Sequence, residues 1–206
     1  PVSYIVLEAS SFNEEIISNG KLHAYRKAAL RFNAPGSIEK INYHNGAWAK
    51  QGAIIARLNS DAQKIAINNA ENDVANARLE LSSLLLGHGG EAQDSGSVPP
   101  AIYENLKLQS GLFQANNTLE SAELQFAHTM IKAPFSGIIT DIEAQTHNLI
   151  TGSDIFCHIL DVSKFIAEFP VIENELALIK IGQKVKVIPF ALEALVMEGS
   201  ISEINP

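Results

Sequence analysis

Apolar residues recur along the chain in two rhythms, and each rhythm predicts a different structure. Between residues 59 and 130 they recur at alternating intervals of three and four, which is typical of helices packed along a narrow seam. The first seam comprises Ile67, Ala70, Val74, Ala77, Leu81 and Leu84, and the second comprises Leu108, Leu112, Ala115, Leu119, Ala122 and Phe126. Two narrow seams joined by a short connection predict an antiparallel helical hairpin.

Residues at the borders of this stretch support two helices. Asn59, Ser60 and Asp61 are helix-capping types, and neither proline nor glycine follows until Gly87. The second helix is expected to run from about Pro100 to Met130, with one glycine inside it. The turn-forming residues 87–100 are expected to form the tip. Arms of ~27 residues, at ~1.5 Å per residue, predict a rod about 40 Å long.

Short β-like segments flank the hairpin. Strands are expected at 4–7 and 16–22, the latter with a turn at Asn19-Gly20. The sequence Ala-Pro-Gly-Ser-Ile at 34–38 is echoed by Ala-Pro-Phe-Ser-Gly-Ile at 133–138. Each copy alone would expose one apolar face, so the repeat predicts that the two copies combine into one β-domain. The second copy lacks a glycine equivalent to Gly46, and we expect Asn148 to supply the left-handed turn residue.

These segments predict a mainly β fold with a long antiparallel α-helical coiled-coil hairpin. We expect N-terminal strands in 1–31, the first half of the β-domain in 32–58, the hairpin in 59–130 with its tip at 87–100, the second half in 131–162, and the start of a further β-domain in 163–206. Further strands are expected near 165–169, 182–188 and 199–202.

The amino-acid composition argues against several classes of function. The net charge is −8 and no basic stripe exists, so nucleic-acid binding is not expected. The single cysteine, Cys157, excludes an internal disulfide framework and a thiolate-rich metal site. The six histidines are isolated from one another, and no nucleophile or phosphate-binding motif is present. We therefore expect no enzyme activity, no cofactor and no metal. No apolar run is long enough to span a bilayer.

The order of these segments resembles the periplasmic adaptor, or membrane fusion, proteins of bacterial tripartite efflux pumps, of the RND type. Residues 129–139 resemble the family's entry into the second half of its lipoyl-like domain, and residues 45–58 resemble the first half. Residues 181–185 and 199–206 resemble the start of its β-barrel. The resemblance implies a split lipoyl-like (barrel-sandwich hybrid) domain, a partial β-barrel and no active site.

The family resemblance also implies a function. Such adaptors join an inner-membrane efflux transporter to an outer-membrane channel, as a ring of six, for the export of small molecules. It implies a periplasmic location and an inner-membrane anchor in an N-terminal segment outside residues 1–206. The tip would dock on the channel, and we expect His88, Glu91 and Asp94 to contact it. The family's arginine–leucine–serine pattern near the tip is not reproduced after Arg78.

Two alternatives concern other functional classes. A lipoyl or biotin carrier needs a modified lysine at a tight turn joining the two halves, but the hairpin fills that junction, and Lys50 and Lys132 lie outside it. A carrier is therefore disfavoured. A coiled-coil scaffold of a secretion or ABC-type export system remains open. An N-terminal export signal or lipoprotein cysteine, together with a further β-domain, would favour the adaptor.

Amide side chains are frequent on the predicted helices. Either they let neighbouring rods pack without charge repulsion, or they form a solvated face. The amides are Asn68, Asn69, Asn72, Asn76, Gln109, Gln114, Asn116, Asn117 and Gln125.

Overall fold

The structure is a computed structural model that describes residues 15–92, 94–191 and 195–205. It divides the chain into two compact units. One comprises residues 25–163 and contains the helices of the hairpin. The other combines the described residues up to Ala24 with those from Lys164 onward. The expected strand at 4–7 lies outside the described residues.

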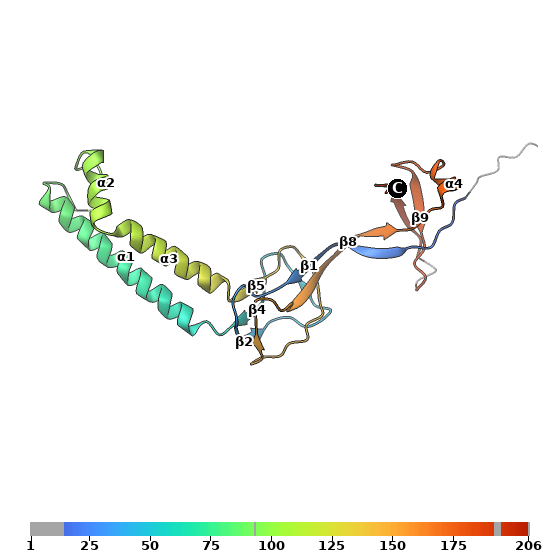
Figure 1. Cartoon of the computed structure of the whole chain (residues 1–206), viewed down its shortest axis with the longest axis horizontal. Coiled ribbons are helices and arrows are strands. Elements are labelled where there is room, and N and C mark those ends of the chain that lie inside the picture. Colours follow the sequence, from blue (N-terminus) through green and yellow to red (C-terminus); the bar gives the residue numbers. More distant parts are fainter. Residues whose placement is uncertain (1–14, 93, 192–194, 206) are drawn as a thin grey trace, which may run out of the picture. The chain divides into compact units, whose positions relative to one another are not determined.

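Two four-stranded sheets contain the strands of the larger unit (Figure 1), and two strands of the first sheet extend past the unit's bounds at residues 25 and 163. Strand order in the first is β1-β8-β6-β3, with bounds Lys21–Leu30, Cys157–Glu168, Gly137–Thr140 and Trp48–Ala49. Strand order in the second is β5-β4-β2-β7, with bounds Met130–Lys132, Ile54–Leu58, Gly36–Ile41 and Leu149–Ile150. The pairs β3–β6, β2–β7 and β4–β5 are antiparallel, and each joins a strand before the hairpin to one after it.

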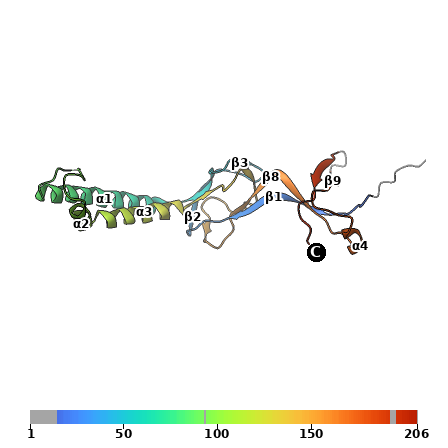
Figure 2. The ribbon, with the colours of Figure 1, turned by 90° about the horizontal axis from the view of Figure 1, so that it is seen from above.

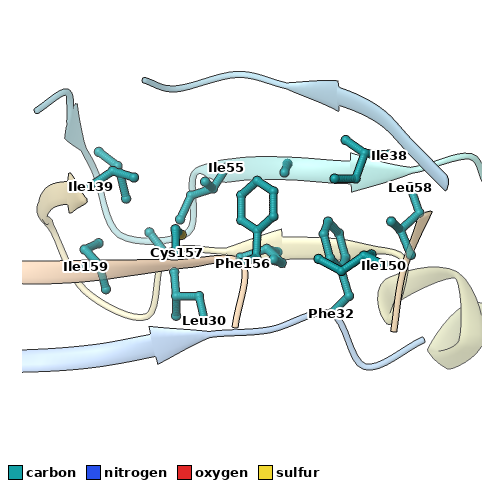
Figure 3. Packing of buried hydrophobic residues seen from close by; sticks show 14 residues of the cluster. Leu30, Phe32, Ile38, Ile55, Leu58, Ile139, Ile150, Phe156, Cys157 and Ile159 are labelled. Carbon is teal, nitrogen blue, oxygen red and sulfur yellow. The ribbon is translucent and has the colours of Figure 1, made fainter. Parts of the chain in front are cut away.

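One hydrophobic core lies among these strands (Figure 3). Phe32 and Phe156 meet edge to face inside it, with ring centroids 5.4 Å apart. Both copies of the sequence repeat contribute to the core, so the expected packing of the two copies together is found. Its buried members are Leu30, Phe32, Ile38, Ala49, Ile55, Ala56, Leu58, Ile131, Ala133, Ile139, Ile150, Phe156, Cys157 and Ile159.

A left-handed residue lies shortly before β3 in the first copy and shortly before β7 in the second. In the first copy it is Gly46, with φ 86°, as glycine readily permits. In the second it is His147, with φ 71°. The prediction that Asn148 takes this conformation is wrong, because the position equivalent to Gly46 falls one residue earlier. β3 pairs with β6 directly after Gly46, as β7 pairs with β2 shortly after His147.

The first arm of the hairpin is helix α1, Asp61–Gly87, and both of its ends agree with the sequence prediction. Ser60 stands at the N-cap without a side-chain hydrogen bond to the helix. Asn59 contacts the first helical residue instead, since its Nδ2 donates to Asp61 Oδ2 at 3.0 Å. Of the three helix-capping residue types expected here, Asn59 makes the side-chain contacts with the first helical residue.

The second arm is not one helix, which corrects the sequence prediction. It consists of α2, Pro100–Gln109, and α3, Leu112–Ala127. Between them Gly111 has φ 72°, a left-handed conformation that ends one helix and redirects the chain before the next. Figures 1 and 2 show α3 alongside α1, while Figure 1 shows α2 turned steeply from the line of α3.

The smaller unit holds a two-stranded antiparallel ribbon of β9, Lys184–Val187, and β10, Met197–Ser200. A short helix, α4, spans Glu173–Leu176. The turn predicted at Asn19-Gly20 is absent, and β1 simply begins after it. Gly20 instead lies against another strand, where an added Cβ would stand 2.3 Å from the Glu168 carbonyl oxygen. No described apolar side chain of this unit is fully buried.

Candidate docking surface

Small apolar residues line the contact between α1 and α3. Ala70, Val74, Ala77 and Leu81 are buried on α1, which confirms the middle of the predicted seam. Leu112, Ala115 and Ala122 are buried on α3, where Leu119 and Phe126 are half-buried. Alanine at several of these positions lets the helix backbones approach closely. Each helix thus hides a narrow stripe and leaves most of its surface available for contacts.

The seam prediction fails at the end nearest the tip. Leu108, expected in the seam, is 66% exposed, whereas Leu106 is 2% exposed. The reason is the break at Gly111, which changes the direction of α2 and therefore the face that it turns toward α1. Leu85, Val98 and Leu106 form the tip end of one buried cluster that also contains seam residues of α1 and α3. Tyr103 packs against this cluster, and we refer to its tip end as the small core.

The tip is a folded cap. The Gly90 N–H donates to the Leu85 carbonyl at 2.9 Å, which turns the chain back onto the end of α1. A side chain at Gly90 would meet Ser97 Oγ at 2.7 Å and Val98 Cγ1 at 2.9 Å. The described residues of the tip therefore fold back onto the end of α1, and the buried Val98 anchors them.

The three residues predicted to bind a partner lie on this cap, and all three are exposed. His88 Nδ1 lies 2.9 Å from the Leu84 carbonyl oxygen, so that nitrogen carries the proton and the ring caps α1. Asp94 shapes the next turn, because its Oδ1 accepts the Gly96 N–H at 2.8 Å. The Glu91 carbonyl accepts the Asp94 N–H at 3.2 Å. Two of the three side chains thus also hold the local fold.

Large apolar residues also lie on the outer faces of the hairpin. On α1 these are Ile65, Leu79 and Leu86, which are 60%, 69% and 59% exposed. On α3 they are Phe113 and Leu124, at 58% and 57%. The α1 residues recur at multiples of seven, so they share the face opposite the buried seam. We refer to these five residues as the outer stripes. These residues were not among the expected contact residues, although the seven-residue interval on α1 is present in the sequence.

An open groove of about 500 Å³ lies beside the break in the second arm. Its lining is polar and partly acidic: Asp73, Asn76, Ala77, Glu80, Ser110, Gly111, Gln114, Ala115 and Thr118. No bulky apolar side chain lines it. A shallow polar groove of this kind suits contact with another protein surface better than enclosure of a small molecule.

Titratable groups of the β-core are held by internal contacts. Arg26 donates from Nε and Nη2 to Asp161 Oδ2 at 3.0 and 2.6 Å, and its guanidinium lies 4.6 Å from the Phe135 ring centroid. Hydrogen bonds from Ser163 and then Arg26 lower the pKa of Asp161 to about 2. This cluster fastens β1 to β8.

Two further groups lie near each other on the first sheet. His158 Nδ1 is 2.9 Å from Asp141 Oδ2. Burial, followed by the charge of Asp141, raises the pKa of the Cys157 thiol to about 12, so this thiol is unreactive. Among the described residues, no three His, Cys, Asp or Glu side chains gather closely enough to hold a metal ion. Within the same residues, no helix combines the length and apolarity needed to cross a bilayer.

Similarity to known proteins is distant in sequence. No protein-family profile matches the chain. It is similar to the nodulation protein NolF of Rhizobium meliloti, with 20% identity over 195 residues that cover 91% of this chain and 53% of NolF. The chain thus spans about half the length of this curated relative.

Solved structures give a closer match in shape. A MacA–MexA chimeric protein, containing the α-hairpin domain of Pseudomonas aeruginosa MexA, has a TM-score of 0.75 at 16% identity, over 93% of this chain and 68% of the chimera. The membrane fusion protein Spr0693 of Streptococcus pneumoniae R6 has a TM-score of 0.69 at 17% identity, over 90% and 81%. The resemblance inferred from the sequence is therefore confirmed at the level of the fold: the chain has the fold of the periplasmic adaptor, or membrane fusion, proteins.

Proposed function

We propose that this chain is the core of a non-enzymatic periplasmic adaptor that links an inner-membrane efflux transporter to an outer-membrane channel. The observation that carries the proposal is the insertion of an antiparallel hairpin between two halves of one β-core. Such an insertion exposes a long helical surface while the core stays closed. The similarity in fold to a membrane fusion protein supports it.

The proposal assigns a role to each part of the fold. The β-core is a split lipoyl-like domain, formed by residues 32–58 and 131–162. The smaller unit is part of a β-barrel domain, and its unburied apolar side chains support this, since they lack the cover that a complete barrel would give. The whole adaptor is anchored to the inner membrane by an N-terminal segment outside residues 1–206.

The hairpin provides two contact surfaces in this proposal. The cap, with His88, Glu91 and Asp94, docks on the channel; its folded geometry supports this because an ordered surface loses less entropy on binding. The outer stripes pack against neighbouring copies in a ring. Their seven-residue interval on α1 suits a helix of a second copy.

Cysteine cross-linking in cells tests the docking role. Cysteines at Glu91 and Asp94 should form adducts with the outer-membrane channel, whereas a cysteine at Asn72, at mid-helix, should not. Cys157 is buried and does not compete. Adducts from Asn72 alone, or full efflux by a protein that lacks residues 88–98, would contradict docking through the cap.

Analytical ultracentrifugation of the full-length protein tests the ring. The double variant Leu79→Glu, Phe113→Glu should be monomeric at concentrations where the wild type self-associates, because both stripes gain charge. Both positions are more than half exposed, so the fold should persist. Unchanged association would remove the outer stripes from the interface.

A further inference from the structure

The seam of the second arm continues in sequence through the break at Gly111. Leu108 precedes Leu112 by four residues, the same interval that separates the seam residues Ala115 and Leu119. A continuous helix over 100–127 would therefore carry Leu108 into the seam with α1. In the structure α2 turns away, Leu108 is 66% exposed, and Leu106 packs in the small core at the end of the hairpin. The sequence thus supports two arrangements of one segment.

The two arrangements differ in which leucine of α2 is buried. The bent form buries Leu106 and exposes Leu108, whereas a continuous helix would bury Leu108 against α1. The bent form also satisfies backbone groups that the break would leave unpaired. Ser110 Oγ donates to the Lys107 carbonyl at 2.9 Å and accepts the Leu112 N–H at 3.4 Å. Few hydrogen bonds therefore separate the bent form from a continuous helix.

Gly111 is the hinge between them. Its φ of 72° is the left-handed conformation that glycine adopts without steric cost, and in a right-handed helix glycine is tolerated at a modest cost. Ser110 and Gly111 are the two residues between α2 and α3, so one change of backbone conformation there would reorient all of α2.

We propose that the hairpin has two states: the bent form seen here, with Leu106 buried, and a straight form, with Leu108 in the seam and a continuous helix over 100–127. At ~1.5 Å per residue, straightening brings the roughly 15 Å of helix in α2 into line with α3. The length over which the second arm packs along α1 and the surface at the end of the hairpin both change with the state. This inference rests on the hairpin alone and holds whether or not the chain is an efflux adaptor.

The variant Gly111→Ala favours the straight form. An added Cβ meets no atom within 4 Å in the bent form, so the substitution acts through the backbone conformation and not through a clash. Alanine disfavours the left-handed conformation and favours the helix, and together these shift the bent-to-straight ratio about 10- to 100-fold. Gly87→Ala is the matched control, because Gly87 ends α1 with equally open space and no left-handed φ.

The reactivity of thiols introduced on α2 shows whether the hairpin is bent or straight. The single variants Leu106→Cys and Leu108→Cys are made with and without Gly111→Ala, and the rates at which the new thiols react with N-ethylmaleimide are measured. In the native background the thiol of Leu108→Cys should react at least about tenfold faster than that of Leu106→Cys, because only Leu108 is exposed. With Gly111→Ala the ratio of the two rates should fall by about 10- to 100-fold, the shift expected for the bent-to-straight ratio. Gly87→Ala should leave it unchanged, and the buried Cys157 gives no background.

A second variant shifts the equilibrium between the bent and straight forms without changing Gly111. Leu106→Gln places an amide at the buried position of the bent form, so the thiol of Leu108→Cys in that background should become protected. Two outcomes would overturn the proposal. In one, the thiol of Leu106→Cys stays protected in the Gly111→Ala chain; in the other, both thiols react fast because the arm unfolds. Either outcome would mean that the bent form is the only folded arrangement. Helix content from circular dichroism separates these two failures.

Discussion

Gly46 and His147 are equivalent residues of the two halves of the β-core, and each hydrogen-bonds to the other half. The Gly46 N–H donates to the Ile139 carbonyl at 2.8 Å, and the His147 N–H donates to the Ile38 carbonyl at 2.8 Å. Both donors have positive φ, and both acceptors are buried core residues. The two turns are thus a reciprocal pair that fastens each half onto the other.

This pair predicts unequal effects of substitution. Gly46→Ala should lower the free energy of unfolding by about 1–2 kcal/mol, because alanine, unlike glycine, has a steric cost in the left-handed conformation. His147→Gly should stay within about 0.5 kcal/mol of the wild type, since relief of strain is offset by the greater entropy of the unfolded glycine chain. Urea denaturation measures both. Gly152→Ala is the control, with no left-handed φ and its nearest neighbour at 3.5 Å.

The hairpin should unfold independently of the β-core. Val74→Asp buries a charge at a seam position that is 5% exposed and should destabilise the helices by about 3 kcal/mol or more. Leu79→Asp, at a position 69% exposed, should have little effect. Loss of helix is followed by circular dichroism, and the core by the fluorescence of Trp48 in β3. Simultaneous loss of both signals in Val74→Asp would show that the two parts unfold together.

Acid should weaken the attachment of β1 to β8. The folded pKa of Asp161, about 2, is lower than its ordinary value of 3.8, so its contacts stabilise the chain fully above about pH 4 and this contribution is lost as the pH falls toward 2. Arg26→Gln removes one cause of the lowered pKa. The difference in denaturation midpoint between wild type and variant should therefore be constant from about pH 5 to 7, by this linkage, and shrink below about pH 4.

Arg57→Gln is the control for the acid experiment. Arg57 pairs with Glu39 at 3.2 Å, but both side chains are more than a third exposed, so the pair contributes little. A midpoint difference for Arg26→Gln that does not change with pH, even in strong acid, would contradict the role of Asp161.

The cap should be sensitive to substitution at Gly90. Gly90→Val places a branched side chain against Ser97 and Val98, where even a Cβ is too close. The turn must open, so limited proteolysis should cut within residues 88–98 several-fold faster than in the wild type. Gly87→Val has open space and should be cut at the wild-type rate. Equal resistance of both variants would mean that the cap does not depend on this close approach.

Much of the fold could be predicted because local patterns and packing agree. The interval of three and four located the seam residues Ala70 to Leu81, and the repeat around Pro35 and Pro134 indicated a shared core. The boundaries of α1 followed from residue types with strong positional preferences. In each case the same residues satisfy both the local conformation and the core.

The tip could not be predicted from periodicity. The spacing of Leu108 fits a straight helix, and nothing in that spacing reveals that Gly111 adopts the left-handed conformation instead. The choice depends on Leu106 and Val98 packing in one small core, which is a tertiary contact. The same limit applies to His147, because a left-handed histidine is recognised only once its partner carbonyl on Ile38 is known. The docking roles of His88, Glu91 and Asp94 stay predictions.

The antiparallel pairing of β4 with β5 has a consequence for the rate of folding. Arg57 and Met130 pair directly, although the whole hairpin separates them in sequence. Closing a disordered loop of about seventy residues is entropically costly and slows the formation of such contacts. The contacts within the hairpin join residues that are closer in sequence. A hairpin that forms early therefore brings Leu58 and Met130 together. The inserted helices then serve as a kinetic template for the β-core, and a variant such as Val74→Asp should delay the recovery of Trp48 fluorescence during refolding.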